Sequence, residues 1–317
     1  DMIKEEEVVV MISKLGYIKR VPLTQYKAQS RGGKGSLSAT LIEGDYINQI
    51  FTATTKSFIT FFTNAGKVYW IKVHEIPEAS RSSRGSSVKS LIQLSPDEEI
   101  STIVTMKDYT DQQYIFMSTA NGTVKKCKTT EFANAKTRGV IGIKLHDGDH
   151  LVSAMLTSGN DDAMLITRKG QALRVSEESV RPMGRASSGV TGIRLASGDE
   201  VAAAISVEQN KDALVITEKG YGKRVGFDEF GKHGRGTGGQ KIFGNIEGKG
   251  EIIGAIAVSE TDEVICMSGQ GKTLRVSAAM ISKQGRASSG TRIINIDEPD
   301  YVVGFDKVAN EDEKDKE

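Results

Sequence analysis

One motif recurs six times along this chain of 317 residues, and it constrains the fold more than any other feature. Each copy holds a short run of β-forming residues, a Ser or Thr, a glycine, and a second β-forming run. The glycines are Gly16, Gly66, Gly122, Gly170, Gly220 and Gly271, spaced 48 to 56 residues apart. Self-similarity at a period of roughly 20 to 50 residues is typical of repeat architectures. Each copy should therefore be one structural unit.

Other positions keep register with that glycine. Four residues after it come Arg20, Trp70, Lys126, Arg174, Arg224 and Arg275. Ten residues after it come the apolar Tyr26, Ile76, Phe132, Val180, Phe230 and Ile281. Fifteen residues after it come Arg31, Arg81, Arg185, Arg235 and Arg286, each followed four residues later by another glycine. The third copy is shorter, with Ala135 in place of the arginine.

The repeat predicts an all-β fold. Runs such as residues 8–12, 164–167 and 201–207 are rich in β-formers and too short for typical helices. The glycine between two runs supplies the positive φ of a tight hairpin, and the apolar residue at offset ten should anchor the chain in the core. About four strands in each of six repeats indicate the radial blades of a propeller-like disc. Kelch and WD40 repeats are alternatives, but a single Trp and no Trp-Asp dipeptide weigh against both.

We expect one domain over residues 8–309, between the end of an acidic linker at 1–7 and an acidic tail at 310–317. Its blades should span about 8–56, 57–112, 113–161, 162–211, 212–261 and 262–309. The whole chain has a net charge of +1, but residues 8–310 hold 39 basic and 32 acidic residues. The body is therefore basic between acidic ends.

Composition also bears on the cellular compartment of the protein and on membrane association. Two cysteines, Cys127 and Cys266, provide neither a disulfide framework nor a zinc site, which favours a reducing cytosolic location. No apolar run approaches the roughly 18 residues that span a bilayer, so we expect no membrane partner.

The repeated arginines point to a polyanion. Any single basic residue after a hairpin can be a solvated side chain that protects a strand edge. Edge protection requires a charge, but it does not require five loops in which Arg stands beside Gly, Ser and Ala, such as residues 185–189 and 286–290. Their small residues let a phosphate backbone approach closely, and contacts to phosphate position a duplex without reading its sequence. A ring of such contacts would bend it.

The loop at residues 29–35 of the first repeat carries a family resemblance. Its residues Gln29, Ser30, Arg31, Gly32, Gly33, Lys34 and Gly35 match six of the seven positions of Gln-Arg-Arg-Gly-Gly-Lys-Gly. That loop marks the C-terminal domain of the DNA gyrase A subunit, which the six repeats also resemble over roughly residues 8–309. Ser30 replaces the first Arg of the marker, so the role of Arg at that position does not carry over.

The resemblance implies a six-bladed β-pinwheel whose blades exchange strands with their neighbours. It also implies that duplex DNA wraps around the rim, so that the rest of gyrase passes one segment through another and introduces negative supercoils using ATP. The marker loop should then bind DNA together with a basic rim. The rim residues that we expect are Lys19, Arg20, Arg81, Arg84, Lys126, Arg138, Arg174, Arg185, Arg224, Arg235, Arg275 and Arg286.

Partners follow from the same resemblance: the remainder of the gyrase A subunit, together with the gyrase B subunit, two copies of each, in the bacterial cytoplasm near the nucleoid. We expect the isolated domain to be monomeric. We expect no cofactor in it, with ATP and Mg²⁺ bound elsewhere in the holoenzyme. No tyrosine here follows an arginine, as the DNA-cleaving tyrosine of gyrase does, so we expect the chain to bind DNA and not to catalyse.

Several short segments resemble motifs of nucleotide-binding or metal sites. Residues 271–273 end like a P-loop, but Gly271 is the sixth turn glycine. Residues 234–239 fit a dinucleotide fingerprint with no βαβ unit around it. The segment 146–150 could supply metal ligands but fits an acidic turn, so we expect no metal site. A protein-interaction platform remains the main alternative, and an enzyme with its site in a central channel is a third.

Overall fold

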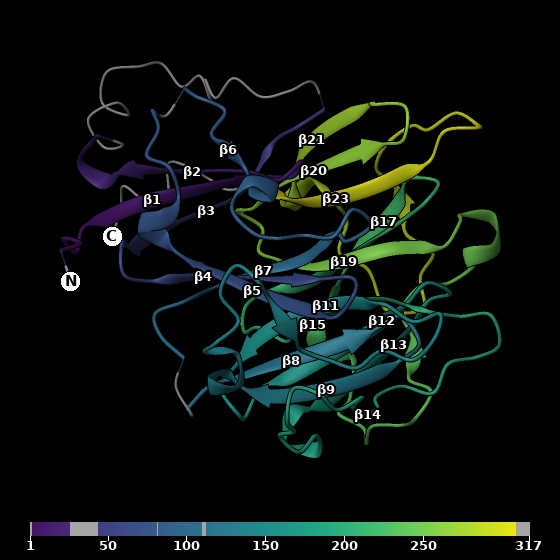
Figure 1. The fold of residues 1–317 in the computed structure, drawn as a ribbon. Coiled ribbons are helices and arrows are strands. Elements are labelled where there is room, and N and C mark those ends of the chain that lie inside the picture. The colour runs from purple at the N-terminus through teal and green to yellow at the C-terminus, as the bar shows by residue number, and fades with distance from the viewer. Residues whose placement is uncertain (1, 26–43, 81, 110–111, 309–317) are drawn as a thin grey trace.

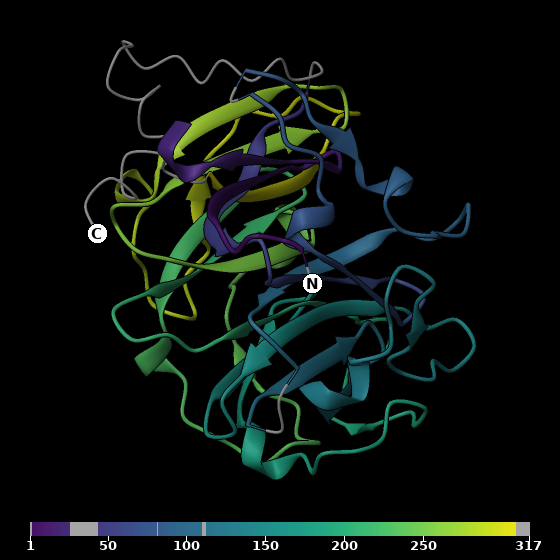
Figure 2. The same cartoon turned by 60° about the vertical axis from the view of Figure 1, so that its left-hand side comes forward.

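The computed structural model describes residues 2–25, 44–80, 82–109 and 112–308. In this part of the chain the strands form six antiparallel sheets arranged as the blades of a pinwheel (Figure 1). The first and last blades lie side by side at the top of both views (Figures 1 and 2), where Tyr46, Ile265 and Val308 pack together. The predicted all-β, six-bladed fold is confirmed.

Each blade has the same order of strands from the centre outward. The innermost strands are β3 (Ile47–Thr54), β7 (Ile100–Met106), β11 (Leu151–Thr157), β15 (Val201–Ser206), β19 (Ile252–Val258) and β23 (Val302–Val308). Next come β1 (Glu7–Ser13), β4 (Phe58–Thr63), β8 (Tyr114–Thr119), β12 (Asp162–Thr167), β16 (Asp212–Thr217) and β20 (Glu263–Ser268). The third strands are β2 (Tyr17–Pro22), β5 (Lys67–Lys72), β9 (Thr123–Lys128), β13 (Gln171–Ser176), β17 (Tyr221–Gly226) and β21 (Thr273–Ser277).

The outermost strand of a blade comes from the following repeat, so strands are exchanged between neighbours. These strands, of two residues each, are β6 (Ser86–Ser87), β10 (Val140–Ile141), β14 (Val190–Thr191), β18 (Gln240–Lys241) and β22 (Thr291–Arg292). Within the described residues the sixth sheet has three strands. The short 3₁₀ helices are η1 (Val73–Glu75), η2 (Val88–Ser90), η3 (Thr129–Phe132), η4 (Glu177–Ser179), η5 (Phe227–Glu229), η6 (Ile246–Gly248) and η7 (Ala278–Met280).

The hairpin between the second and third strands explains the Ser or Thr before the turn glycine. In the fourth blade Gly170 has a φ of 96°, which favours glycine, and its N–H donates to the carbonyl of Thr167 at 3.2 Å. The Thr167 hydroxyl in turn accepts the N–H of Gln171 at 3.0 Å. Equivalent hydroxyl contacts close the hairpins of the other five blades.

The apolar core lies between neighbouring blades. One cluster, for example, joins Val10 and Ile12 of the first blade to Ile59 and Phe61 of the second. The described offset-ten residues are all buried in these clusters: Ile76, Phe132, Val180, Phe230 and Ile281. Their predicted anchoring role is confirmed, whereas Tyr26 lies outside the described residues.

Candidate nucleic-acid interface

Strand exchange places the arginine loops at the periphery of the disc. Each loop immediately precedes an outermost strand: Arg84 comes two residues before β6, and Arg138 two before β10. The loops of Arg185, Arg235 and Arg286 precede β14, β18 and β22 in the same way. Basic residues of successive repeats therefore recur around the rim. Arg185, Arg235 and Arg286 hold the predicted offset of fifteen, whereas Arg84 and Arg138 come from other positions of their loops.

The arginines of these loops differ in their exposure and in the contacts of their guanidinium groups. Arg84, Arg138 and Arg235 are exposed, and Arg185 and Arg286 are half-buried. Arg84 lies over the ring of Tyr17 at 5.5 Å, and Arg235 donates to the carbonyls of Ser179 and Thr191. Within the described part of the chain, the guanidinium groups of Arg138, Arg185 and Arg286 form no hydrogen bond or ion pair. They are free to contact a ligand.

A glycine at the end of each loop fixes the loop against the preceding blade. Gly189 has a φ of 89°, and a Cβ added there would lie 2.5 Å from the carbonyl oxygen of Val124 in β9. A Cβ at Gly85 would lie 2.5 Å from the carbonyl oxygen of Ile18 in β2. The loop can pass this close to the neighbouring strand only with glycine at that position.

The basic residues at offset four have a different role from the one that we expected. Four of the five donate to a main-chain carbonyl in or next to a 3₁₀ helix of the following blade. Arg20 donates to Ile76 at 2.6 Å, Lys126 to Glu177 at 2.9 Å, Arg174 to Phe227 at 3.1 Å and Arg224 to Ile281 at 2.8 Å. These side chains connect neighbouring blades. Arg275 belongs to the last blade and pairs with Glu263 of its own hairpin at 3.1 Å.

Acidic partners hold several of these cations in place. Asp162 pairs with Arg174 at 3.0 Å and with Lys232 at 3.3 Å. One blade further on, Asp212 pairs with Arg224 at 3.1 Å and Lys283 at 3.0 Å. Lys126 lies 3.6 Å from the buried carboxylate of Glu177 and 4.9 Å from the ring of Tyr114. These charges are largely neutralised within the protein.

Three predicted rim residues are buried. Lys19, Lys126 and Arg224 are exposed by 1 %, 4 % and 5 %, so the expectation that they lie on an open rim does not hold. Their hydrogen bonds to neighbouring blades supply the physical reason. Arg81 and the marker loop at residues 29–35 lie outside the described residues.

Acidic turns cap the hairpins on one face of the disc. Asp149, in the segment that resembles a metal site, accepts the N–H of Asn121 at 3.0 Å. Asp199 accepts the N–H of Lys169 at 3.0 Å, and Asp300 that of Gln270 at 3.0 Å. Among the described residues, no three or more His, Cys, Asp or Glu side chains are grouped to hold a metal ion.

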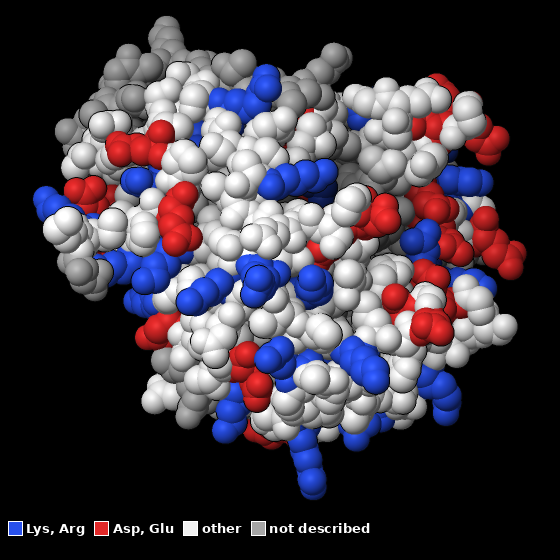
Figure 3. Space-filling model, in the orientation of Figure 1, with Lys and Arg blue, Asp and Glu red and all other residues white. Residues whose placement is uncertain are grey.

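Lys and Arg gather in a band across the middle and lower part of the face in Figure 3, whereas the larger groups of Asp and Glu lie toward its right side. No helix in the described ranges is long and apolar enough to cross a membrane.

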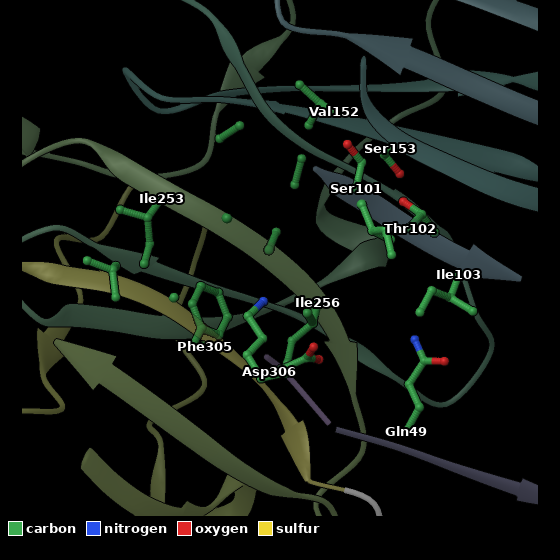
Figure 4. Close-up of a pocket in the computed structure, with 18 of the residues that line it drawn as sticks. Gln49, Ser101, Thr102, Ile103, Val152, Ser153, Ile253, Ile256, Phe305 and Asp306 are labelled. Carbon is green, nitrogen blue, oxygen red and sulfur yellow. The ribbon is translucent and has the colours of Figure 1, made fainter. Parts of the chain in front are cut away.

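The innermost strands surround a cavity of about 470 Å³ at the centre of the disc. Figure 4 shows the hydroxyls of Ser101, Thr102 and Ser153 gathered on one side of it. The Ser101 hydroxyl donates to the carbonyl of Leu151 at 3.0 Å, and that of Ser153 to Ala204 at 3.0 Å. These hydroxyls therefore link neighbouring inner strands.

The family model described as "DNA gyrase C-terminal domain, beta-propeller" matches six segments that follow the blades. They are residues 7–54, 57–105, 113–158, 161–208, 211–259 and 262–309. The chain belongs to this family. The DNA gyrase A subunit of Treponema pallidum (strain Nichols) is 60 % identical over 305 residues, and that of Escherichia coli (strain K12) is 40 % identical over 309. These matches take in 96 % and 98 % of the chain but only 38 % and 35 % of the relatives.

Solved structures of this family and of a sister enzyme share the fold. A structure of the DNA gyrase A C-terminal domain superposes with a TM-score of 0.72 at 34 % identity, covering 96 % of this chain and 100 % of the other. The C-terminal domain of DNA topoisomerase IV gives a TM-score of 0.86 at 26 % identity, covering 97 % and 94 %. The fold is therefore common to these two C-terminal domains.

Proposed function

We propose that this domain binds duplex DNA with little sequence preference and bends it around the rim of the pinwheel. The observation that carries the proposal is the recurrence of arginine loops directly before the outermost strands of successive blades. Free guanidinium groups at Arg138, Arg185 and Arg286 supply phosphate contacts, which fix a duplex in place without reading its bases.

Bending follows from the circular arrangement of the loops. A straight duplex can contact the loops of one or two blades, whereas a curved one contacts more. Smooth bending of a site of 20 to 30 bp costs on the order of 1 to 6 kcal/mol. The additional phosphate contacts must offset that free energy, so a longer duplex should bind more tightly than a short one.

A salt titration tests the binding mode. If about 6 to 10 phosphates are neutralised, the affinity should fall roughly 10³- to 10⁵-fold between 50 and 200 mM salt. Two duplexes of equal length and unrelated sequence should give the same curve. Salt-independent binding, or a strong preference for one sequence, would contradict this binding mode, and failure to bind any duplex would favour a protein-interaction platform.

The place of this domain in a larger machine is part of the proposal. Its relatives are subunits of DNA gyrase, so the wrapped segment would be delivered to the rest of the gyrase A and gyrase B proteins in the bacterial cytoplasm. Those parts would bind ATP and Mg²⁺ and cleave DNA. Wrapping would give strand passage the direction that leads to negative supercoils.

The marker loop would complete the wrap next to the catalytic core. Replacing Arg31 and Lys34 with Ala should then abolish ATP-dependent supercoiling by the reassembled enzyme and leave ATP-independent relaxation intact. The matched control replaces Arg185 and Arg235, one arginine from each of two other loops. Equal losses of supercoiling in both double variants would remove the special role of residues 29–35.

A further inference from the structure

Three lysines are fully enclosed in this protein at equivalent positions of alternate blades. Lys19, Lys125 and Lys223 each follow a turn glycine by three residues and are exposed by 1 %, 0 % and 0 %. The same position of the second, fourth and sixth blades holds Tyr69, Leu173 and Leu274. The buried cation is therefore a feature of every second blade.

Each ammonium contacts the arginine loop of the following repeat. The Lys223 ammonium donates to the carbonyls of Gly285, Arg286 and Ser288 at 2.8 to 3.0 Å, and to the Ser288 hydroxyl at 3.1 Å. The Lys125 ammonium donates in the same manner to the carbonyls of Arg185 and Ser187 at 2.7 and 2.9 Å.

The first blade repeats this arrangement, with Lys19 donating to the carbonyls of Ser80 and Ser83 at 3.3 and 2.7 Å. A turn closed by the hydroxyl of its fourth residue accompanies all three lysines. The hydroxyls of Ser83, Ser187 and Ser288 donate to the carbonyls of Ser80, Gly184 and Gly285 at 2.7 to 3.0 Å.

A buried ammonium is costly unless its protons are hydrogen-bonded. Within the described residues neither Lys125 nor Lys223 forms an ion pair, so main-chain carbonyls carry most of that compensation. Drawing the carbonyl of Arg185 inward also sets its peptide plane, because C=O and N–H lie on opposite sides of a trans peptide. The N–H of Ala186 therefore points away from Lys125, and Ala186 is exposed.

We propose that Lys19, Lys125 and Lys223 are positioning residues that hold three alternate rim loops in the conformation that receives a DNA phosphate. This inference rests on the proposed function. The lysines do not touch the duplex; they fix the main chain so that the arginine of a loop and an outward N–H, such as that of Ala186, act together. In the loop held by Lys223 the N–H of Arg286 is already bonded to the Glu229 carboxylate at 3.1 Å, so there the lysine positions the arginine. Within the described residues, three lysine-held loops then alternate with the loops of the third and fifth repeats, which have no lysine beneath them. In the fifth repeat, for example, Arg235 itself donates to Ser179 and Thr191.

A double-mutant cycle between Lys125 and Arg185 tests the positioning role. Lys125→Met keeps the length of the stem and removes the ammonium. In the wild-type background Arg185→Ala should weaken duplex binding roughly eightfold at 0.1 M salt, the value of one phosphate contact. In the Lys125→Met background the same change should weaken binding less than twofold, because the loop is already displaced.

Arg235→Ala is the control for the cycle. Its loop has no buried lysine beneath it, so its effect should be the same in both backgrounds. Leu173→Met is the matched substitution at the equivalent position of the fourth blade and should leave binding unchanged. If Lys125 acted only through blade stability or through its distant charge, Arg185→Ala would weaken duplex binding by the same factor in both backgrounds, as Arg235→Ala does.

Amide hydrogen exchange measures how firmly the loop is held in the absence of DNA. Lys125→Met should speed exchange at residues 184–189 but not at residues 234–239. If Lys125→Met fails to fold, Lys223→Met with Arg286→Ala provides the same cycle in another blade. Independent effects in the cycle, or unchanged exchange, would overturn the positioning role while wild-type binding upholds the proposed function. Failure of the wild type to bind any duplex would overturn both.

Discussion

The indole N–H of Trp70 donates to the carbonyl oxygen of Phe132 at 2.9 Å. This contact joins the second blade to the third at the position where the first, third, fourth and fifth blades use an arginine or lysine. Phe58 meets the indole edge-on at 4.8 Å, on the strand position that carries Asp162 and Asp212 in later blades. In each of these blades the side chain at offset four donates to a carbonyl of the next blade. Its partner on the neighbouring strand of its own blade is an aromatic ring in the second blade and an aspartate in the fourth and fifth.

Arg224→Ala should destabilise the fold more than it weakens DNA binding. The substitution leaves the Ile281 carbonyl without its donor and removes one of the cations that pair with Asp212. Breaking a buried, hydrogen-bonded pair costs about 3 kcal/mol in the free energy of unfolding. Urea unfolding measures this loss. Arg275→Ala is the control, because the two side chains of that pair are 41 % and 49 % exposed and the pair should contribute less than about 1 kcal/mol. Equal losses would contradict the role in connecting blades.

Gly189→Ala should detach the exchanged strand β14 from β9. The positive φ and the carbonyl of Val124 at 2.5 Å both oppose a side chain there, so we expect a loss of at least about 2 kcal/mol. Gly184, five residues earlier, has open space around it, and Gly184→Ala should change stability by less than about 0.5 kcal/mol. Thermal unfolding of the two variants provides the comparison, and a destabilised Gly184→Ala would contradict the packing argument.

Arg138→Ala should weaken DNA binding and leave stability nearly unchanged, the opposite of Arg224→Ala. Arg138 is exposed and its guanidinium forms no hydrogen bond or ion pair within the described residues, so the free energy of unfolding should change by less than about 0.5 kcal/mol. The dependence of log affinity on log salt should lose about 0.9 in slope, which corresponds to one phosphate contact. Duplex titrations at four salt concentrations measure the slope. A slope equal to that of the wild type would exclude Arg138 from the interface.

The stability that Lys223 contributes should depend on pH. Burial lowers the pKa of its ammonium to about 8, with the carboxylate of Glu229 opposing the shift. Between about pH 8 and the ordinary lysine pKa of 10.5, the unfolded chain binds the proton that the native state has lost. Stability therefore rises with pH in that window. The difference in unfolding free energy between wild type and Lys223→Met should shift in favour of wild type from pH 8 to pH 10. A shift in the other direction would show that the carbonyl contacts outweigh burial.

Much of the fold could be predicted because the repeat keeps its register. The turn glycines and the apolar residue at offset ten are local requirements of each hairpin and of the core, and six copies make them visible. The arginine loops could be found for the same reason.

The roles at offsets three and four could not be predicted in this way. Whether Arg224 faces solvent or the next blade depends on the carbonyl of Ile281, 57 residues away. A lysine such as Lys125 looks like a surface residue until the following loop is placed over it. The alternation of Lys with Tyr and Leu at offset three was the one available signal, and only the six copies taken together show it.

Bending of DNA by the domain is the central claim, and fluorescence transfer between dyes on the two ends of one duplex measures it most directly. A duplex of about 40 bp is well below the persistence length of roughly 150 bp and is nearly straight when free. Titration with the domain at low salt should raise the transfer to a plateau that coincides with saturation of binding. Variants that lack Arg138, Arg185 and Arg286 together should reach a lower plateau. Transfer that stays at its starting value while the duplex is fully bound would contradict wrapping.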